Sequence, residues 1–223
     1  MRWPWGSRRQ IAWSMALVLL RMAVFGTILF GVTRPLLTEG LPPRIGANPQ
    51  LLEDAILAAL AAGFAWVLIG RVPGASWEDL GLARKGLARN VALGVATFAF
   101  GLLIILVRAR IEGVMPIEAW QAVTGYSARQ RVQMLLVAVH VVFGEELIFR
   151  GYMQPGLRAR YSAPVAIGIT SLIFALYHVD FSLHGFLGHV LWGVVWGLAR
   201  ERSGSTVPPS VAHFLNWAVL GWF

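Results

Sequence analysis

The chain of 223 residues contains no cysteine. This absence excludes disulfides, thiolate metal sites and cysteine-nucleophile chemistry, including transpeptidases of the cysteine type. Acidic residues are also scarce, since there are 11 Asp and Glu beside 19 Lys and Arg, and only 13% of the residues are charged. A typical globular domain has about 25% charged residues. The low charge therefore favours a membrane protein over a soluble one.

Long apolar runs are abundant, because 57% of the residues are hydrophobic and the mean hydropathy is +0.64. A transmembrane helix needs roughly 20 apolar residues, which the longer runs supply and the shorter runs reach with flanking residues. The pattern predicts an all-α fold, a polytopic transmembrane helical bundle with about seven to eight spans. The runs cover residues 11–32, 51–70, 91–107, 132–149, 163–177, 186–198 and 207–223.

No repeat, low-complexity stretch or long linker divides the chain. We therefore expect one integral-membrane domain over residues 1–223. Within it, the polar residues discussed below fall in a core of about 131–223, and the N-terminal portion, 1–130, holds three of the predicted helices.

The N-terminus, MRWPWGSRRQ, is basic and precedes an apolar run that is too long for a signal-peptide core and lacks a small-x-small cleavage site. We interpret this run as a retained first helix. With the N-terminus in the cytoplasm and seven spans, cytoplasmic segments hold about twice as many Lys and Arg as outer ones. This explains the net charge of +8 without a nucleic-acid partner. We expect a multi-pass protein of the cell inner (cytoplasmic) membrane, bacterial by its Arg-, Ala- and Trp-rich composition.

The stretch VVFGEELIFRGYM places three ionisable residues inside a predicted span, where each costs roughly 2.5 to 3.5 kcal/mol near the bilayer centre. On an α-helix Arg150 lies about 40° from Glu146 and about 140° from Glu145. The spacing predicts a structural ion pair between Glu146 and Arg150. Glu145 is then left without that partner, as a candidate general base acting on water.

The next span ends in SLIFALYHVD, which contains His178. We expect a turn at residues 161–164, and from there Glu145 and His178 lie roughly 24 and 21 Å along their helices. Similar depths would let the carboxylate and the imidazole face each other, as water activation requires. A kink or break at Pro155 and Gly156 would shorten the first helix.

The last span opens with STVPPSVAHFLNW, in which Pro208 and Pro209 suit a helix start. Asn216 follows His213 by three residues, so both project to one side. An imidazole and a carboxamide together can donate hydrogen bonds to a developing oxyanion. The candidate catalytic set comprises Glu145, His178, His213 and Asn216.

Other polar residues inside the spans have less specific interpretations. A single membrane histidine is more often a helix-packing residue than a catalyst, and we assign His140, His184 and His189 to packing or to the interface. Arg21 lies in the middle of the first run. Its partner stays open between Glu53, Asp54 and a water-filled cavity.

Three short motifs resemble those of one family. EELIFRG, from Glu145, resembles the first motif (EExxxR) of the CAAX protease and bacteriocin-processing family of type II CAAX prenyl endopeptidase-like intramembrane proteases. FALYH, ending at His178, resembles the second motif (FxxxH), and HFLNW, from His213, is similar to the third. The resemblance covers about residues 133–217, and three motifs in order are more specific than any one of them.

The resemblance implies a helical membrane peptidase in which Glu145 and His178 activate water. It also implies that the third motif supplies oxyanion donors, here His213 and Asn216. Characterised members place the asparagine four residues after the histidine, where this chain has Trp217. The supporting residues implied are Glu146, Arg150 and Phe174.

A zinc mechanism is the alternative for the same residues, since Glu145, His178 and His213 include zinc-type ligands. However, no HExxH pairs two ligands on one helix turn, and the resemblance implies a glutamic-type mechanism, so we expect no cofactor. The sequence also lacks the HExxH, GxSG and GxGD motifs of other intramembrane protease classes.

We therefore predict an intramembrane endopeptidase that acts on a membrane-associated peptide or protein within the lipid bilayer. The alternative is a non-proteolytic member that acts in bacteriocin self-immunity or binds peptides. The sequence leaves the substrate and the oligomeric state open.

Overall fold

The structure is a computed structural model that describes residues 6–26, 55–56, 58–63, 76–82, 84–111, 113 and 125–220. Within these ranges every regular element is helical, which confirms the all-α prediction for this part of the chain. The elements are α1 (Arg8–Gly26), α3 (Leu87–Ile111), α5 (Ala128–Val141), the π-helix η3 (Val142–Met153), α6 (Gln154–Arg158), α7 (Ala163–Tyr177), α8 (Leu183–Ser203), α9 (Val207–Leu215) and the π-helix η4 (Asn216–Leu220).

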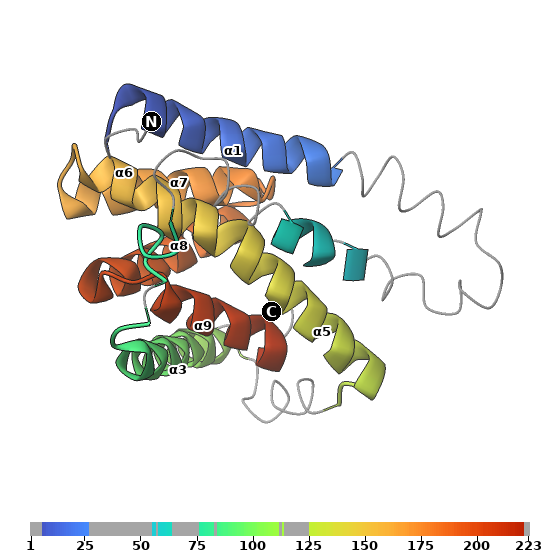
Figure 1. Cartoon of the computed structure of the whole chain (residues 1–223). Helices are drawn as coiled ribbons and strands as arrows, with labels where there is room; N and C mark the ends of the chain where they lie inside the picture. Colours follow the sequence, from blue (N-terminus) through green and yellow to red (C-terminus); the bar gives the residue numbers. More distant parts are fainter. Residues whose placement is uncertain are drawn as a thin grey trace, which may run out of the picture.

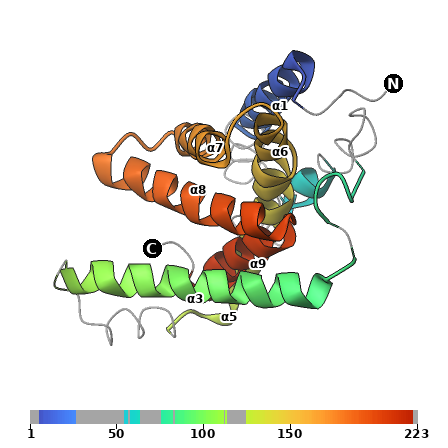
Figure 2. The same cartoon turned by 90° about the vertical axis from the view of Figure 1, so that its left-hand side faces the viewer.

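A single helical rod crosses the middle of the molecule, because α5, η3 and α6 follow one another without a break (Figure 1). α1 lies along one side of this rod and packs against η3 and α6. α7 and α8 pack against each other, and α3 packs against α9 on the side away from α1 (Figure 2). α9 also contacts the rod at α5 and η3. The three predicted motifs therefore lie on elements that meet at η3.

Local capping explains several helix ends. Ser127 and Gln130 form a capping box at the start of α5. Ser182 caps α8 by accepting a hydrogen bond from the Gly185 N–H. The hydroxyl and the backbone N–H of Ser182 both donate to Asp180, and these bonds hold the pKa of Asp180 below its usual range. Gly204 ends α8 in the left-handed conformation, at φ 65°.

Prolines open the helices where the sequence predicts. Pro164 stands in the first turn of α7, and Pro208 and Pro209 in that of α9. The rod continues through Pro155 and Gly156 to the end of α6, so the kink or break considered there does not shorten it. Pro155 has no N–H to donate within the rod, and the carbonyl oxygen of Arg150, five residues earlier, accepts a hydrogen bond from Nε of Arg200 at 2.9 Å.

Two helices of the described residues have the length and composition of membrane spans, Leu87–Val107 and Ala128–Arg158, and Ala163–Tyr177 is a shorter apolar helix. These agree with three of the predicted runs. The total of seven to eight spans, the single domain and the orientation stay predictions. Most of the predicted run 51–70, the end of the run 11–32 and residues 221–223 lie outside the described residues.

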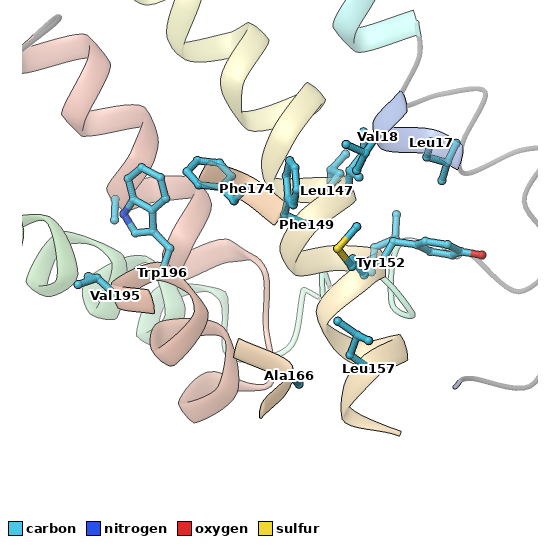
Figure 3. Packing of buried hydrophobic residues seen from close by; sticks show 14 residues of the cluster. Leu17, Val18, Leu147, Phe149, Tyr152, Leu157, Ala166, Phe174, Val195 and Trp196 are labelled. Atoms are coloured by element: carbon cyan, nitrogen blue, oxygen red, sulfur yellow. The ribbon is translucent and has the colours of Figure 1, made fainter. Parts of the chain in front are cut away.

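Aromatic rings join the rod to the α7–α8 pair. Phe149 of η3 and Phe174 of α7 are almost fully buried and meet edge to face, with ring centroids 5.2 Å apart. Phe174 also meets Trp196 of α8 at 5.8 Å, and Figure 3 shows its ring between those of Phe149 and Trp196. Such pairs contribute about 0.5–1.5 kcal/mol each beyond their buried area. They fix α7 and α8 against the first motif.

Candidate active site

The first motif lies on η3, a π-helix. Backbone hydrogen bonds in a π-helix run from residue i to i+5, and such segments are rare and frequent at functional sites. The rotation per residue about the helix axis is therefore smaller than in an α-helix. The angles predicted between Arg150 and the two glutamates assumed an α-helix and are wrong for this segment. The predicted ion pair still forms, with Nη1 of Arg150 lying 3.3 Å from Oε1 of Glu146.

His213 of α9 joins the third motif to the first. Its Nδ1 lies 2.8 Å from Oε1 of Glu146 and donates a hydrogen bond to it. The imidazole also stacks on the Trp196 ring, with centroids 3.7 Å apart and planes at 23°. Glu146 thus binds both Arg150 and His213, a link that the sequence analysis did not predict.

Glu145 and His178 face each other, as their matched depths predict. Oε2 of Glu145 lies 3.8 Å from Nε2 of His178. Nδ1 of His178 lies 2.7 Å from the carbonyl oxygen of Phe174. Because a carbonyl can only accept, Nδ1 holds the proton and Nε2 of the neutral ring is an acceptor. Oε2 of Glu145 is buried and has no hydrogen-bond partner among the described residues. Two acceptors thus face each other, and a water molecule that donates to both would satisfy them.

Arg21 of α1 holds the other oxygen of the same carboxylate. Its Nη2 lies 3.7 Å from Oε1 of Glu145 and 2.7 Å from Nε2 of His140. The guanidinium carbon also lies 5.0 Å from the centroid of the Tyr177 ring, within cation–π range. Glu145 is thus one partner of Arg21, which the sequence analysis did not consider, while Glu53 and Asp54 lie outside the described residues. His140, which we assigned to packing or the interface, also contacts Arg21.

The buried charges cancel in number. Arg21, Glu146 and Arg150 are each 0% exposed and Glu145 is 5% exposed. An unpaired buried charge costs several kcal/mol, whereas paired charges offset part of that cost. Among the described residues, two buried carboxyl groups therefore stand against two buried guanidiniums, which limits the cost of placing them in an apolar bundle.

Phe174, predicted as a supporting residue, contacts several parts of this cluster. The guanidinium carbon of Arg150 lies 4.4 Å from its ring centroid, and its carbonyl accepts from His178. On the other side, the imidazole of His178 stacks on His189 of α8, with centroids 3.9 Å apart. The ring of His178 is thus held by a backbone hydrogen bond and by a stacked neighbour.

The exposed flank of the cluster is at His178. Its side chain is 18% exposed, whereas those of Glu145 and His213 are 7% and 5% exposed. His178 caps the C-terminus of α7, and the following Val179 has a positive φ of 54°. Val179 and Phe181 in this connection are both exposed. Water or a substrate would therefore reach the buried carboxylate past His178.

Asn216 stands apart from the contacts above. It is half-buried and begins η4, three residues after His213. Among the described residues no hydrogen bond or ion pair joins the Asn216 side chain to the other candidate groups. Its contribution to the site stays a prediction.

In the part of the chain that the structure describes, no group of three or more His, Cys, Asp or Glu side chains is placed to hold a metal ion. The three residues of the zinc alternative are instead divided between two sets of contacts. Glu145 faces His178, and His213 binds Glu146. The arrangement does not fit a three-ligand zinc site made of Glu145, His178 and His213.

Sequence reasoning did not assign to the site four residues that lie at or next to the candidate catalytic side chains. The sequence contained evidence for one of them and not for the other three. Arg21 carried a clear one, since a charge in the middle of an apolar run requires a partner. His140, His189 and Trp196 carried none beyond their presence in apolar helices, because their neighbours come from other helices.

In the described residues the fold is all-helical, with a buried glutamate that faces a histidine and two helices that have the length and composition of membrane spans. Residues 127–219 match the family described as type II CAAX prenyl endopeptidase Rce1-like. The match confirms the resemblance of the three motifs and identifies this segment, less than half of the chain, as Rce1-like; α1 and α3 lie outside it. Neither a curated protein nor a solved structure matches the chain.

Proposed function

We propose that this protein is an intramembrane endopeptidase of the glutamic type, which hydrolyses a peptide bond of a membrane-associated peptide or protein. The observation that supports this most directly is the 3.8 Å separation of two acceptors, Oε2 of Glu145 and Nε2 of His178, in a buried site. The match to an endopeptidase family supports the reaction class.

The water between Glu145 and His178 is the proposed nucleophile. Glu145 accepts one proton of this water while the water oxygen forms a bond to the peptide carbonyl carbon. Nε2 of His178 accepts a hydrogen bond from the second O–H of the water and orients the molecule. When the C–N bond breaks, the proton held by Glu145 passes to the leaving nitrogen, so the carboxylate is regenerated.

His213 is the proposed oxyanion donor. Its Nδ1–H is used by Glu146, so donation from Nε2 requires the doubly protonated ring, and the positive charge that this adds to the cluster is offset by the developing oxyanion. A preorganised donor of this kind is worth about 10²–10³ in kcat. Asn216 is the proposed second donor, and its side chain would have to turn toward the site when a substrate binds.

The test uses the purified full-length protein in lipid vesicles with a library of fluorophore–quencher peptides that carry an apolar anchor. Wild type is compared with Glu145→Gln and His178→Gln, which keep the side-chain size close to that of the original. We expect cleavage by the wild type and a loss of about 10²–10⁴-fold in each variant. Cleavage that persists in both variants would refute the mechanism.

A wild type that binds peptides from this library without cutting them would instead favour the non-proteolytic role. In that case the Glu145→Gln variant should bind as tightly as the wild type, because the carboxylate would have no chemical task.

A further inference from the structure

α1 buries a polar face against the rod. Gln10, Ser14 and Arg21 are 2%, 1% and 0% exposed, together with Leu17 and Val18 between them. Successive residues of the series Gln10, Ser14, Leu17 and Arg21 are four, three and four positions apart, which places them on one side of an α-helix. A first span that only anchored the protein in lipid would not need such a face.

Two glycines of the rod make room for this face. A Cβ on Gly144 would lie 2.5 Å from Nη2 and 2.6 Å from Nε of Arg21, and a Cβ on Gly156 would collide with the Gln10 amide. Nε2 of Gln10 also donates to the Tyr152 carbonyl at 3.1 Å. Since Gln10 lies near Gly156 and Arg21 near Gly144, α1 runs antiparallel to the rod. The two glycines lie on either side of the EExxxR motif.

The contact between Arg21 and the carboxylate of Glu145 is at Oε1. Nη2 of Arg21 lies near Oε1, while Oε2 is the atom that faces His178. His140 accepts from the same Nη2 and holds the guanidinium from the α5 side. A carboxylate fixed at one oxygen presents the other in a defined direction, which is what a bridging water between Glu145 and His178 requires.

We propose that Arg21 is a positioning residue for Glu145, so that α1, although outside the segment that matches the endopeptidase family, completes the active site. The proposal rests on the proposed function. Arg21 acts through Glu145, the group proposed to activate the water. It holds Oε1 and neutralises the carboxylate, and Oε2 is thereby kept toward His178.

The experiment uses the full-length protein with the peptide that the wild type cleaves best. Arg21→Met keeps the length of the side chain and removes its charge, and Arg21→Lys keeps the charge. We expect Arg21→Met to lower kcat by about 10²-fold with KM nearly unchanged, since a small misplacement of a catalytic group costs that much. Arg21→Lys should recover part of the loss. The matched control is Ser14→Ala, on the same buried face, which should leave kcat unchanged.

A thermal unfolding cycle tests the pairing without any activity measurement. Arg21→Met should lower the Tm of the wild type by more than it lowers the Tm of Glu145→Gln, because in that background the carboxylate is already neutral. Gly144→Ala supplies a second route to the same loss, since its methyl group displaces the guanidinium, and it is expected to lower kcat like Arg21→Met.

The outcomes separate the two proposals. If the wild type cleaves and Glu145→Gln does not, while Arg21→Met keeps full kcat, the role of Arg21 is refuted and the proposed function stands. If Arg21→Lys is as inactive as Arg21→Met while both unfold like the wild type, a charge-based role is also refuted. If Arg21→Met does not fold, Gly144→Ala and Arg21→Lys decide by the same criteria.

Discussion

The Nδ1–H of His213 donates a hydrogen bond of 2.8 Å to Oε1 of Glu146. The same oxygen lies 3.3 Å from Nη1 of Arg150. Glu146 is therefore the residue through which α9 and the rod share one buried charge network. Nη2 of Arg150 extends the network by donating to the carbonyl of Gly193 in α8 at 3.4 Å.

Glu146 should matter first for stability. Glu146→Gln leaves the Arg150 guanidinium buried without a carboxylate, which costs about 3–5 kcal/mol. In the double variant Glu146→Gln/Arg150→Met both charges are gone, so its Tm should lie above that of Glu146→Gln alone. Thermal unfolding in detergent measures both, and equal Tm values for the single and double variants would contradict this role.

Gly193 allows α7 and α8 to pack closely. A Cβ on Gly193 would lie 2.7 Å from Cβ and 2.8 Å from Cα of Ser171, whereas one on Gly188 of the same helix meets nothing within 4 Å. Gly193→Ala should destabilise the protein by about 1–3 kcal/mol. Gly188→Ala is the matched control and should be neutral or raise stability by about 0.5–1 kcal/mol. If the Gly193→Ala protein is as stable as the control, the added methyl group is accommodated without cost and the contact with Ser171 does not require glycine.

Val179 holds a backbone conformation that costs a β-branched residue energy. Its φ of 54° lies in the left-handed region directly after the α7 cap, at a cost of about 1–2 kcal/mol for an L-residue. We expect Val179→Gly to unfold at a higher temperature than Val179→Ala, which keeps a Cβ. The comparison is made by thermal unfolding, and a higher Tm for the alanine variant would mean that the strain lies elsewhere.

Removal of metal ions should not affect hydrolysis by the proposed mechanism. Its nucleophile is a water bound by Glu145 and His178, and no step of it uses a metal ion. We expect kcat to be unchanged after incubation with a strong zinc chelator. Activity that disappears with the chelator and returns with added zinc would replace the glutamic mechanism with a metal-dependent one.

How much of the site the sequence predicted depends on how far apart in the sequence the contacting residues are. Contacts set by helical spacing and turn position were within reach: the Glu146–Arg150 pair and the matched depth of Glu145 and His178 are both present. The Glu146–Arg150 pair forms although η3 is a π-helix, because residues i and i+4 remain neighbours when the helical turn widens.

Contacts between distant helices were out of reach. Arg21 to Glu145, and His213 to Glu146, depend on which helix packs on which, and apolar periodicity does not specify a neighbour. The π-helical turn was also unpredicted, since the residues of this segment have no local pattern that distinguishes it from an α-helix. The place of Asn216 relative to the site and the total number of spans stay predictions.

The pairing of Arg21 with Glu145 also has a consequence for biosynthesis. Arg21 is translated well before Glu145, so the contact between them cannot exist while the first helix is being made, and in the predicted membrane arrangement an arginine within a span costs roughly 2.5 to 3.5 kcal/mol. At about 5–20 residues per second, the roughly 120 residues between the two take on the order of 6–24 s to synthesise. The contact that joins α1 to the rod is therefore a late event in biosynthesis, which forms only once the EExxxR helix has been made.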